Sequence, residues 1–114
     1  MRAPGRPTKG SGRIVYVIAR AAFEAAGDML AYSTSKAAVA SLTQCLAKEV
    51  VDDGILVNAV APSIMDTPAN RAAMPDADFD AWPKVEEVAR TMVWLASPAN
   101  ALTTGTLVPV YGRA

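Results

Sequence analysis

The chain has 114 residues, of which 52% are hydrophobic and 19% charged, a balance typical of one packed domain rather than of disorder. Its 11 basic and 11 acidic residues cancel, so no net field draws it toward nucleic acid or an anionic membrane surface. The single Cys45 cannot form an internal disulfide, the chain has no histidine, and no apolar run is long enough to span a bilayer. Residues 1–9 are basic and rich in Pro and Gly, unlike a signal peptide. We expect a cytoplasmic protein with no metal site, no nucleic-acid partner and no membrane segment.

The predicted elements alternate between strands and helices. A turn at residues 10–12 precedes a β-branched and aromatic run at residues 14–18, which predicts a strand buried on both faces. Apolar residues at helical spacing predict a long helix over residues 32–51, ended by Gly54. A second buried strand is predicted over residues 55–60.

The second half continues this alternation after one long loop. Pro62 cannot continue a strand ladder, so we expect it to close the second strand. Residues 63–83 are rich in proline and lack a sustained period, which predicts an irregular loop of the kind that holds ligands. An amphipathic helix is predicted over residues 85–95 and a third strand over residues 106–110. The order predicts an α/β fold, a partial doubly wound parallel sheet of about three strands with flanking helices.

The motif that carries chemistry is Tyr32-Ser33-Thr34-Ser35-Lys36. Four residues apart on a helix, the phenol of Tyr32 and the ammonium of Lys36 lie one turn above each other, and the positive charge stabilises the phenolate. The pair is a candidate proton donor and acceptor. The spacing alone is common on ordinary helix surfaces, but here a strand precedes it and a strand ending in Val-Asn-Ala-Val-Ala-Pro follows it.

With these neighbours, the chain from Gly10 onward resembles the C-terminal half of the short-chain dehydrogenase/reductase family. The resemblance implies a Rossmann-like fold, in which Tyr32 passes a proton to or from the substrate and Lys36 orients the nicotinamide ribose. It also implies that the turn after the second strand holds the nicotinamide carboxamide, with Ser63 standing where glycine is usual. The implied cofactor-binding residues are Tyr32, Lys36, Pro62, Ser63, Ile64 and Thr67.

One departure from the family pattern points to a branch of the family. The catalytic serine of the family stands 13 residues before the tyrosine, and that count lands on Ala19. The dihydropteridine reductases are similar to this chain in having alanine there. Residues 66–82 also resemble the segment of those reductases that runs Asp-Thr-Pro, Asn-Arg, Met-Pro, Ala-Asp-Phe and Trp. The resemblance therefore implies an NAD(P)H-dependent reductase of a small molecule, with a dihydropterin as the candidate substrate.

A second departure is the absence of the Gly-rich turn that the family uses to bind the dinucleotide. We therefore interpret residues 1–114 as the C-terminal half of such a domain, and expect the isolated chain to bind NADH or NADPH poorly. The strand at residues 14–18 would then expose an edge. The small residues Ala37, Ala38, Ala40, Ser41 and Ala47 predict one smooth helix face, and the resemblance implies a homo-oligomer through the helix beginning at Tyr32.

Other residues have less specific interpretations. Asp76, Asp78, Asp80 and Glu87 have calcium-loop spacing, but Ala81 stands where that loop needs glycine. Cys45 is expected to be a small packing residue in the helix rather than a nucleophile. Met65, Met74 and Trp82 could line a substrate pocket, and Trp82 could equally anchor the loop to the core.

Two functions from different classes stay open on the sequence. The chain is either part of an NAD(P)H-dependent reductase or a truncated, non-catalytic fragment or interaction module that pairs with intact relatives. The sequence upstream distinguishes the two functions, because a Gly-rich half encoded there would favour the enzyme.

Overall fold

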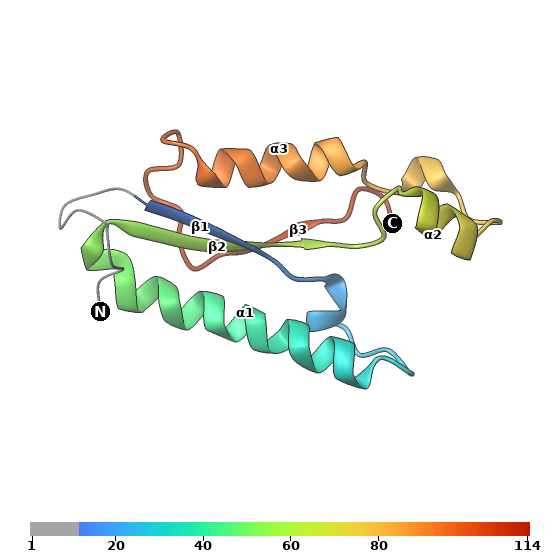
Figure 1. The fold of residues 1–114 in the computed structure, drawn as a ribbon, viewed down its shortest axis with the longest axis horizontal. Helices are drawn as coiled ribbons and strands as arrows, with labels where there is room; N and C mark the ends of the chain where they lie inside the picture. The colour runs from blue at the N-terminus through green and yellow to red at the C-terminus, as the bar shows by residue number, and fades with distance from the viewer. Residues whose placement is uncertain (1–11) are drawn as a thin grey trace.

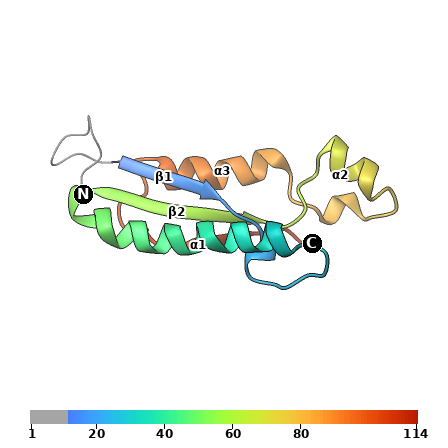
Figure 2. The ribbon, with the colours of Figure 1, turned by 60° about the horizontal axis from the view of Figure 1, so that its bottom comes forward.

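The computed structural model describes residues 12–114, so most of the turn predicted at residues 10–12 and all of residues 1–9 lie outside the described part. Figure 1 shows three layers, with the long helices α1 and α3 on opposite faces of a small sheet, and Figure 2 shows the same separation after rotation. The strands are β1 (Gly12–Val17), β2 (Ile55–Pro62) and β3 (Leu107–Val110). The α-helices are α1 (Leu30–Val50), α2 (Pro68–Ala73) and α3 (Val85–Ala96), and the short 3-10 helices are η1 (Arg20–Ala22), η2 (Val51–Asp53) and η3 (Phe79–Ala81).

The sheet has the order β1-β2-β3, and both strand pairs are parallel, as the alternation of elements predicts. Ile14 pairs with Val57, and Val60 pairs with Val108. Because the strands are parallel, their carboxyl ends meet at one edge of the sheet, where ligands bind in open α/β sheets. The segments after β1 and β2 therefore lie beside each other.

The central strand is longer than predicted. The strand includes Ala61 and Pro62, and Pro62 closes it as predicted, paired with Val110. A terminal position tolerates the missing N–H of proline, and the edge strand β3 likewise accepts the exposed Pro109. In β2, Val57 and Val60 are fully buried, which confirms the predicted buried strand.

The prediction that the first strand is buried on both faces is wrong. Most residues of β1 are only half-buried, and Val17 is 40% exposed. The physical reason is that β1 is an edge strand, which pairs with β2 alone among the described residues. Its outer edge is open, as the sequence analysis expects.

Helix α1 packs one face against the sheet and leaves the other exposed. It begins two residues earlier than predicted, and it ends through η2 at Gly54, whose φ of 75° is the left-handed conformation that glycine adopts readily. The buried residues of α1 are Ala40, Thr43, Ala47 and Val50.

The small residues of α1 do not form the single face that the sequence predicts. Ala40 and Ala47 are buried, whereas Ala37, Ala38 and Ser41 are exposed. The helical period divides the set, because the set spans about half of the helix circumference, with Ala40 and Ala47 at one end and Ala38 and Ser41 at the other. Cys45 is also exposed, so the expectation that it packs in the interior is wrong.

Helix α3 covers the other face of the sheet. Val88 and Leu95 pack with Val60 of β2 in one buried cluster. Val93 and Trp94 are 67% and 48% exposed on the outer side of the helix. In the part of the chain that the structure describes, no helix combines the length and the apolar character needed to cross a membrane.

Buried asparagines hold β3 beside β2. The Asn58 amide nitrogen donates to the main-chain oxygen of Thr103 at 2.9 Å, and its oxygen accepts from the nitrogen of Thr106 at 3.0 Å. Asn100, also buried, donates to the main-chain oxygens of Leu95 and Thr103. The asparagine of the Val-Asn motif therefore has a structural role, satisfying main-chain groups that the short β3 leaves unpaired.

Candidate active site

The carboxyl edge of the sheet holds a cavity of about 530 Å³. Four of the residues predicted from the sequence line it, namely Tyr32, Pro62, Ser63 and Ile64. Ala19 lines it as well. Lys36 and Thr67 are not among its lining residues. The structure thus brings together most of the predicted site, with contributions from α1 and from the segments after β1 and β2.

The Tyr32 and Lys36 side chains lie one helical turn apart on α1. Lys36 Nζ is 5.7 Å from the centre of the Tyr32 ring and donates a hydrogen bond of 3.4 Å to the main-chain oxygen of Val17. That bond ties the ammonium to the end of β1. Tyr32 is 46% exposed, so its hydroxyl is accessible to a ligand. The arrangement places a fixed positive charge beside an accessible phenol.

Ala19 occupies the position where the family carries a serine. It is 8% exposed, and its backbone is extended, with φ −153° and ψ 160°. Its main-chain oxygen accepts a hydrogen bond from the nitrogen of Ala22, which starts η1. The side chain offers no hydrogen-bond donor to the cavity.

Ser63 and Thr67 use their hydroxyl groups inside the protein. Ser63 Oγ donates to the main-chain oxygen of Tyr111 at 3.0 Å, so the residue that replaces the usual glycine ties the turn to the segment after β3. Thr67 Oγ1 accepts from the nitrogen of Asn70 at 3.1 Å and caps α2, in which Pro68 holds the first position. The prediction of an irregular loop over residues 63–83 is therefore wrong, because local capping creates α2 and η3 within it.

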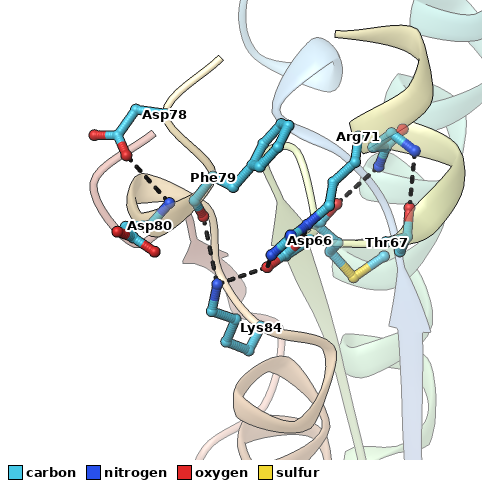
Figure 3. A network of polar contacts seen from close by, with 9 residues as sticks. Asp66, Thr67, Arg71, Asp78, Phe79, Asp80 and Lys84 are labelled. Carbon is cyan, nitrogen blue, oxygen red and sulfur yellow. Dashed lines mark hydrogen bonds and ion pairs between the residues drawn. The ribbon is translucent and has the colours of Figure 1, made fainter. Parts of the chain in front are cut away.

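A carboxylate with two cations organises this loop (Figure 3). Asp66 accepts from Arg71 Nε at 2.6 Å, from Arg71 Nη2 at 2.8 Å and from Lys84 Nζ at 2.6 Å. Its side chain is 8% exposed. The hydrogen bonds from Arg71 and then Lys84 hold the pKa of the Asp66 carboxyl far below its usual range, and the Asp66 carboxylate in turn raises the pKa of Arg71. The triad joins α2 to the start of α3.

Aromatic contacts complete the loop. The Phe79 and Trp82 rings are 4.9 Å apart, and the guanidinium of Arg71 lies 4.6 Å from the centre of the Phe79 ring. Trp82 is 5% exposed and does not line the cavity beside Tyr32, which favours its role as an anchor of the loop. Met65 does line that cavity, whereas Met74 is exposed.

Sequence reasoning missed seven residues of the cavity, namely Arg20, Ala21, Glu24, Ala25, Ala26, Met29 and Asn70. Arg20 has no signal in the sequence, because Tyr111 and Ala114 hold it in place. Asn70 could have been found from the helix start at Thr67-Pro68, because its main-chain nitrogen is capped there, while its side chain donates to the main-chain oxygen of Met65 at 2.8 Å. The cluster of Asp66, Arg71 and Lys84 has no signal in the sequence, since the bend of the loop brings Lys84 back.

The chain is similar to known proteins over most of its length. The profile of a family described as enoyl-(acyl carrier protein) reductase matches residues 1–112. Chanoclavine-I dehydrogenase easD of Claviceps purpurea is 40% identical over 115 residues, which cover 90% of this chain and 41% of that protein. Galactitol 2-dehydrogenase of Rhizobium johnstonii is 44% identical over 90 residues, which cover 70% of this chain and 35% of that protein.

Solved structures show the same arrangement. A short-chain type dehydrogenase/reductase from Mycobacterium ulcerans superposes with a TM-score of 0.82 and 27% identity, over 91% of this chain and 42% of that chain. ElxO with NADP bound gives a TM-score of 0.79 at 27% identity, over 89% and 45% of the two chains. A 4-hydroxyisoleucine dehydrogenase complexed with NADH gives 0.78 at 26% identity, over 91% and 46%.

The fold and these similarities define a class of protein, the Rossmann-like oxidoreductases. Within that class, the chain belongs to the short-chain dehydrogenase/reductase family. It spans less than half the length of the relatives described above.

Proposed function

We propose that this chain is the catalytic, C-terminal half of a reductase that uses a nicotinamide cofactor to reduce a small conjugated acceptor. The observation that carries the proposal is the accessible Tyr32 phenol in a cavity at the carboxyl edge of the sheet, with the Lys36 ammonium fixed beside it. An acid of this kind typically contributes about 100- to 10,000-fold to a rate. Two similar structures hold NADP and NADH, and either cofactor suits the proposal.

The residues present suit a nicotinamide nucleotide. Ile64 is half-buried at the cavity wall, where its main chain can meet a carboxamide, and Lys36 Nζ can hold a ribose hydroxyl. We propose that Tyr32, Lys36, Pro62, Ser63, Ile64 and Thr67 form this part of the cofactor site. The Ser63 hydroxyl donates its hydrogen to Tyr111, so Ser63 contributes by fixing the turn and does not donate to the cofactor. Thr67 Oγ1 can still donate its own hydrogen, because it only accepts from Asn70.

The proposed reaction adds a hydride and a proton to the acceptor. A bound reduced nicotinamide would supply the hydride with its two electrons, next to Tyr32 and Lys36. Tyr32 Oη gives the proton and is reprotonated from solvent. Lys36 acts by charge and by orientation.

A dihydropterin is the proposed substrate class. Ala19 leaves the position of the usual serine without a hydroxyl, so the serine's hydrogen bond to a developing oxyanion is absent. A conjugated, electron-poor ring spreads the incoming charge, and needs that hydrogen bond less than an isolated carbonyl does. Met65 and Ile64 give the cavity apolar walls suited to a flat ring.

The half-buried edge strand supports the proposal that residues 1–114 form half of a domain. A further parallel strand beside β1 would cover this edge, and the relatives described above have more than half of their length outside the match. The exposed free thiol of Cys45 suits a reducing, cytoplasmic setting.

A second candidate role is association with like chains through α1. Its exposed side carries Ala37, Ala38, Ser41, Leu42 and Cys45, and Leu42 is 47% exposed. We propose a homo-oligomer through this side, in which a fragment could also pair with intact relatives. This role and the enzymatic one are compatible.

The test of the proposed function uses a completed protein, which is this chain preceded by the Gly-rich half of a short-chain dehydrogenase/reductase. Oxidation of NADH and NADPH is followed with a quinonoid dihydropterin and with a simple ketone. The proposal expects turnover that is faster with the dihydropterin. Turnover of the ketone alone would contradict the substrate class, and turnover of neither would contradict the function.

A further inference from the structure

Arg20 is a charged residue of the candidate active site that no motif identifies. It opens η1 directly after Ala19 and lines the same cavity as Tyr32. Its guanidinium carbon lies 3.9 Å from the centre of the Tyr111 ring, and Nη2 donates to the main-chain oxygen of Ala114. Stacking and this hydrogen bond hold the planar cation in one place, with 31% of the side chain exposed.

The guanidinium has more donors than the protein uses. Among the described residues, Ala114 is the only acceptor of a hydrogen bond from Arg20 Nη atoms, and Nε is buried without a partner. Glu24 Oε2 is 4.0 Å from Nε, too far for a hydrogen bond, and the Glu24 side chain is 67% exposed. The buried Nε is out of reach of a ligand, but Nη1 makes no hydrogen bond to the described residues and can donate to an acceptor atom in the cavity.

The surroundings increase the effect of this charge. Ala19, Met29, Ile64 and Met65 give the cavity apolar walls, and among the described residues that line it Arg20 is the only basic one and Glu24 the only acidic one. Apolar walls strengthen the electrostatic interaction between an oriented cation and a developing negative charge, because little solvent has to reorganise. A fixed guanidinium can therefore stabilise an oxygen that gains negative charge during hydride transfer.

We propose that Arg20 is a catalytic residue that donates the hydrogen bond which Ala19 lacks, to a carbonyl oxygen of the conjugated acceptor. The inference rests on the proposed function and assigns that site a second polar group. Negative charge that the hydride brings to the ring is shared with this oxygen and is stabilised by the guanidinium. Arg20 gives up no proton, and the proton still comes from Tyr32.

The consequence is that either Arg20 or a serine at position 19 can donate the hydrogen bond to the oxygen of the acceptor. The Arg20→Met variant keeps the length of the side chain but removes the donors, and is expected to lower kcat of the completed protein with a dihydropterin about 10- to 1,000-fold. Adding Ala19→Ser to Arg20→Met should restore at least tenfold of that loss. The Arg90→Met variant removes an exposed arginine of α3 and controls for the loss of one charge.

The experiment measures kcat and KM for these three proteins, together with the midpoint of thermal unfolding. Rescue by the serine is a result that a structural role of Arg20 would not give, because a hydroxyl at position 19 cannot replace the stacking on Tyr111. Unchanged kcat in Arg20→Met, or a loss that Ala19→Ser does not rescue, would overturn the inference while turnover by the parent protein leaves the proposed function standing. If the parent turns over no acceptor, the proposed function fails instead.

An NMR titration tests the role of Arg20 without a measurement of turnover. In the completed protein, uniformly labelled with nitrogen-15, the Arg20 Nε–H resonance is followed while a dihydropterin is added. The expected result is a shift of this resonance that saturates, with no shift for Arg90. A resonance that does not move, while other cavity residues such as Ile64 do, would overturn the role of Arg20.

Discussion

The Lys84 ammonium lies 2.6 Å from the Asp66 carboxylate, although 18 residues separate them in the sequence. The same carboxylate accepts two hydrogen bonds from Arg71, so one buried anion joins three places in the loop. The main chains also meet there, since the nitrogen of Asp66 donates to the oxygen of Pro83 at 2.9 Å. The conformation of the loop over residues 66–83 is therefore stabilised by contacts among Asp66, Arg71, Pro83 and Lys84.

Replacing Asp66 should loosen that loop. Asp66→Asn keeps the shape of the side chain but removes its charge, so both cations lose their partner. We expect amide hydrogen exchange to accelerate at least tenfold over residues 66–83 and to change little in β2. Asp76→Asn, an exposed carboxylate of the same loop, is the control. Equal exchange rates in Asp66→Asn and the parent would show that the triad does not hold the loop.

The triad also predicts a dependence of stability on pH. Since the pKa of Asp66 is lower in the folded chain than in the unfolded chain, the unfolded state binds more protons at acidic pH. The stabilisation is complete above the ordinary carboxyl pKa of about 4, and it is lost as the pH falls toward the folded value. Urea unfolding should therefore show a difference between the parent and Asp66→Asn that is large at pH 7 and shrinks below about pH 4. A difference that is constant over this range would contradict the cause given for the low pKa.

The isolated 114-residue chain should bind cofactor very weakly. The residues proposed for the cofactor can contact the carboxamide and the ribose, whereas a Gly-rich phosphate-binding turn is not found in the sequence. Calorimetric titration with NADH and with NADPH should give no measurable saturation at micromolar concentrations. A micromolar Kd for either cofactor would mean that these contacts suffice.

The open edge of β1 and the exposed side of α1 should make the isolated chain self-associate. The unpaired edge offers main-chain donors and acceptors, and Leu42 is an apolar side chain on the surface of α1. Light scattering at micromolar concentration should report masses above that of the monomer, and Leu42→Gln should reduce them if α1 contributes. A monomer at this concentration would contradict the prediction that the edge of β1 and the exposed side of α1 drive self-association.

The sequence predicts the architecture well because apolar periodicity and parallel topology constrain it strongly. The runs that form β2 and α3 stand within two residues of their predicted positions. It predicts the burial of β1 wrongly, because a β-branched run does not reveal whether a strand has one neighbour or two. It also misses α2, since a six-residue helix begun by the Thr67 cap has no periodicity of its own.

The candidate site is predictable where a short motif determines its geometry. Tyr32 and Lys36 are placed by helical spacing alone, and Pro62 and Ser63 follow from the end of β2. Arg20 is different, because its position depends on Tyr111 and Ala114 from the far end of the chain. Contacts between such distant segments leave no local pattern.

The measurement that tests the central claim most directly compares Tyr32→Phe and Ala19→Ser in the completed protein. Removing the phenol deletes the proton donor and should lower kcat with a dihydropterin about 100- to 10,000-fold. Adding a hydroxyl at Ala19 should change kcat less than tenfold, because the parent already reduces this acceptor without it. Full activity of Tyr32→Phe would contradict the assignment of Tyr32 as the catalytic acid.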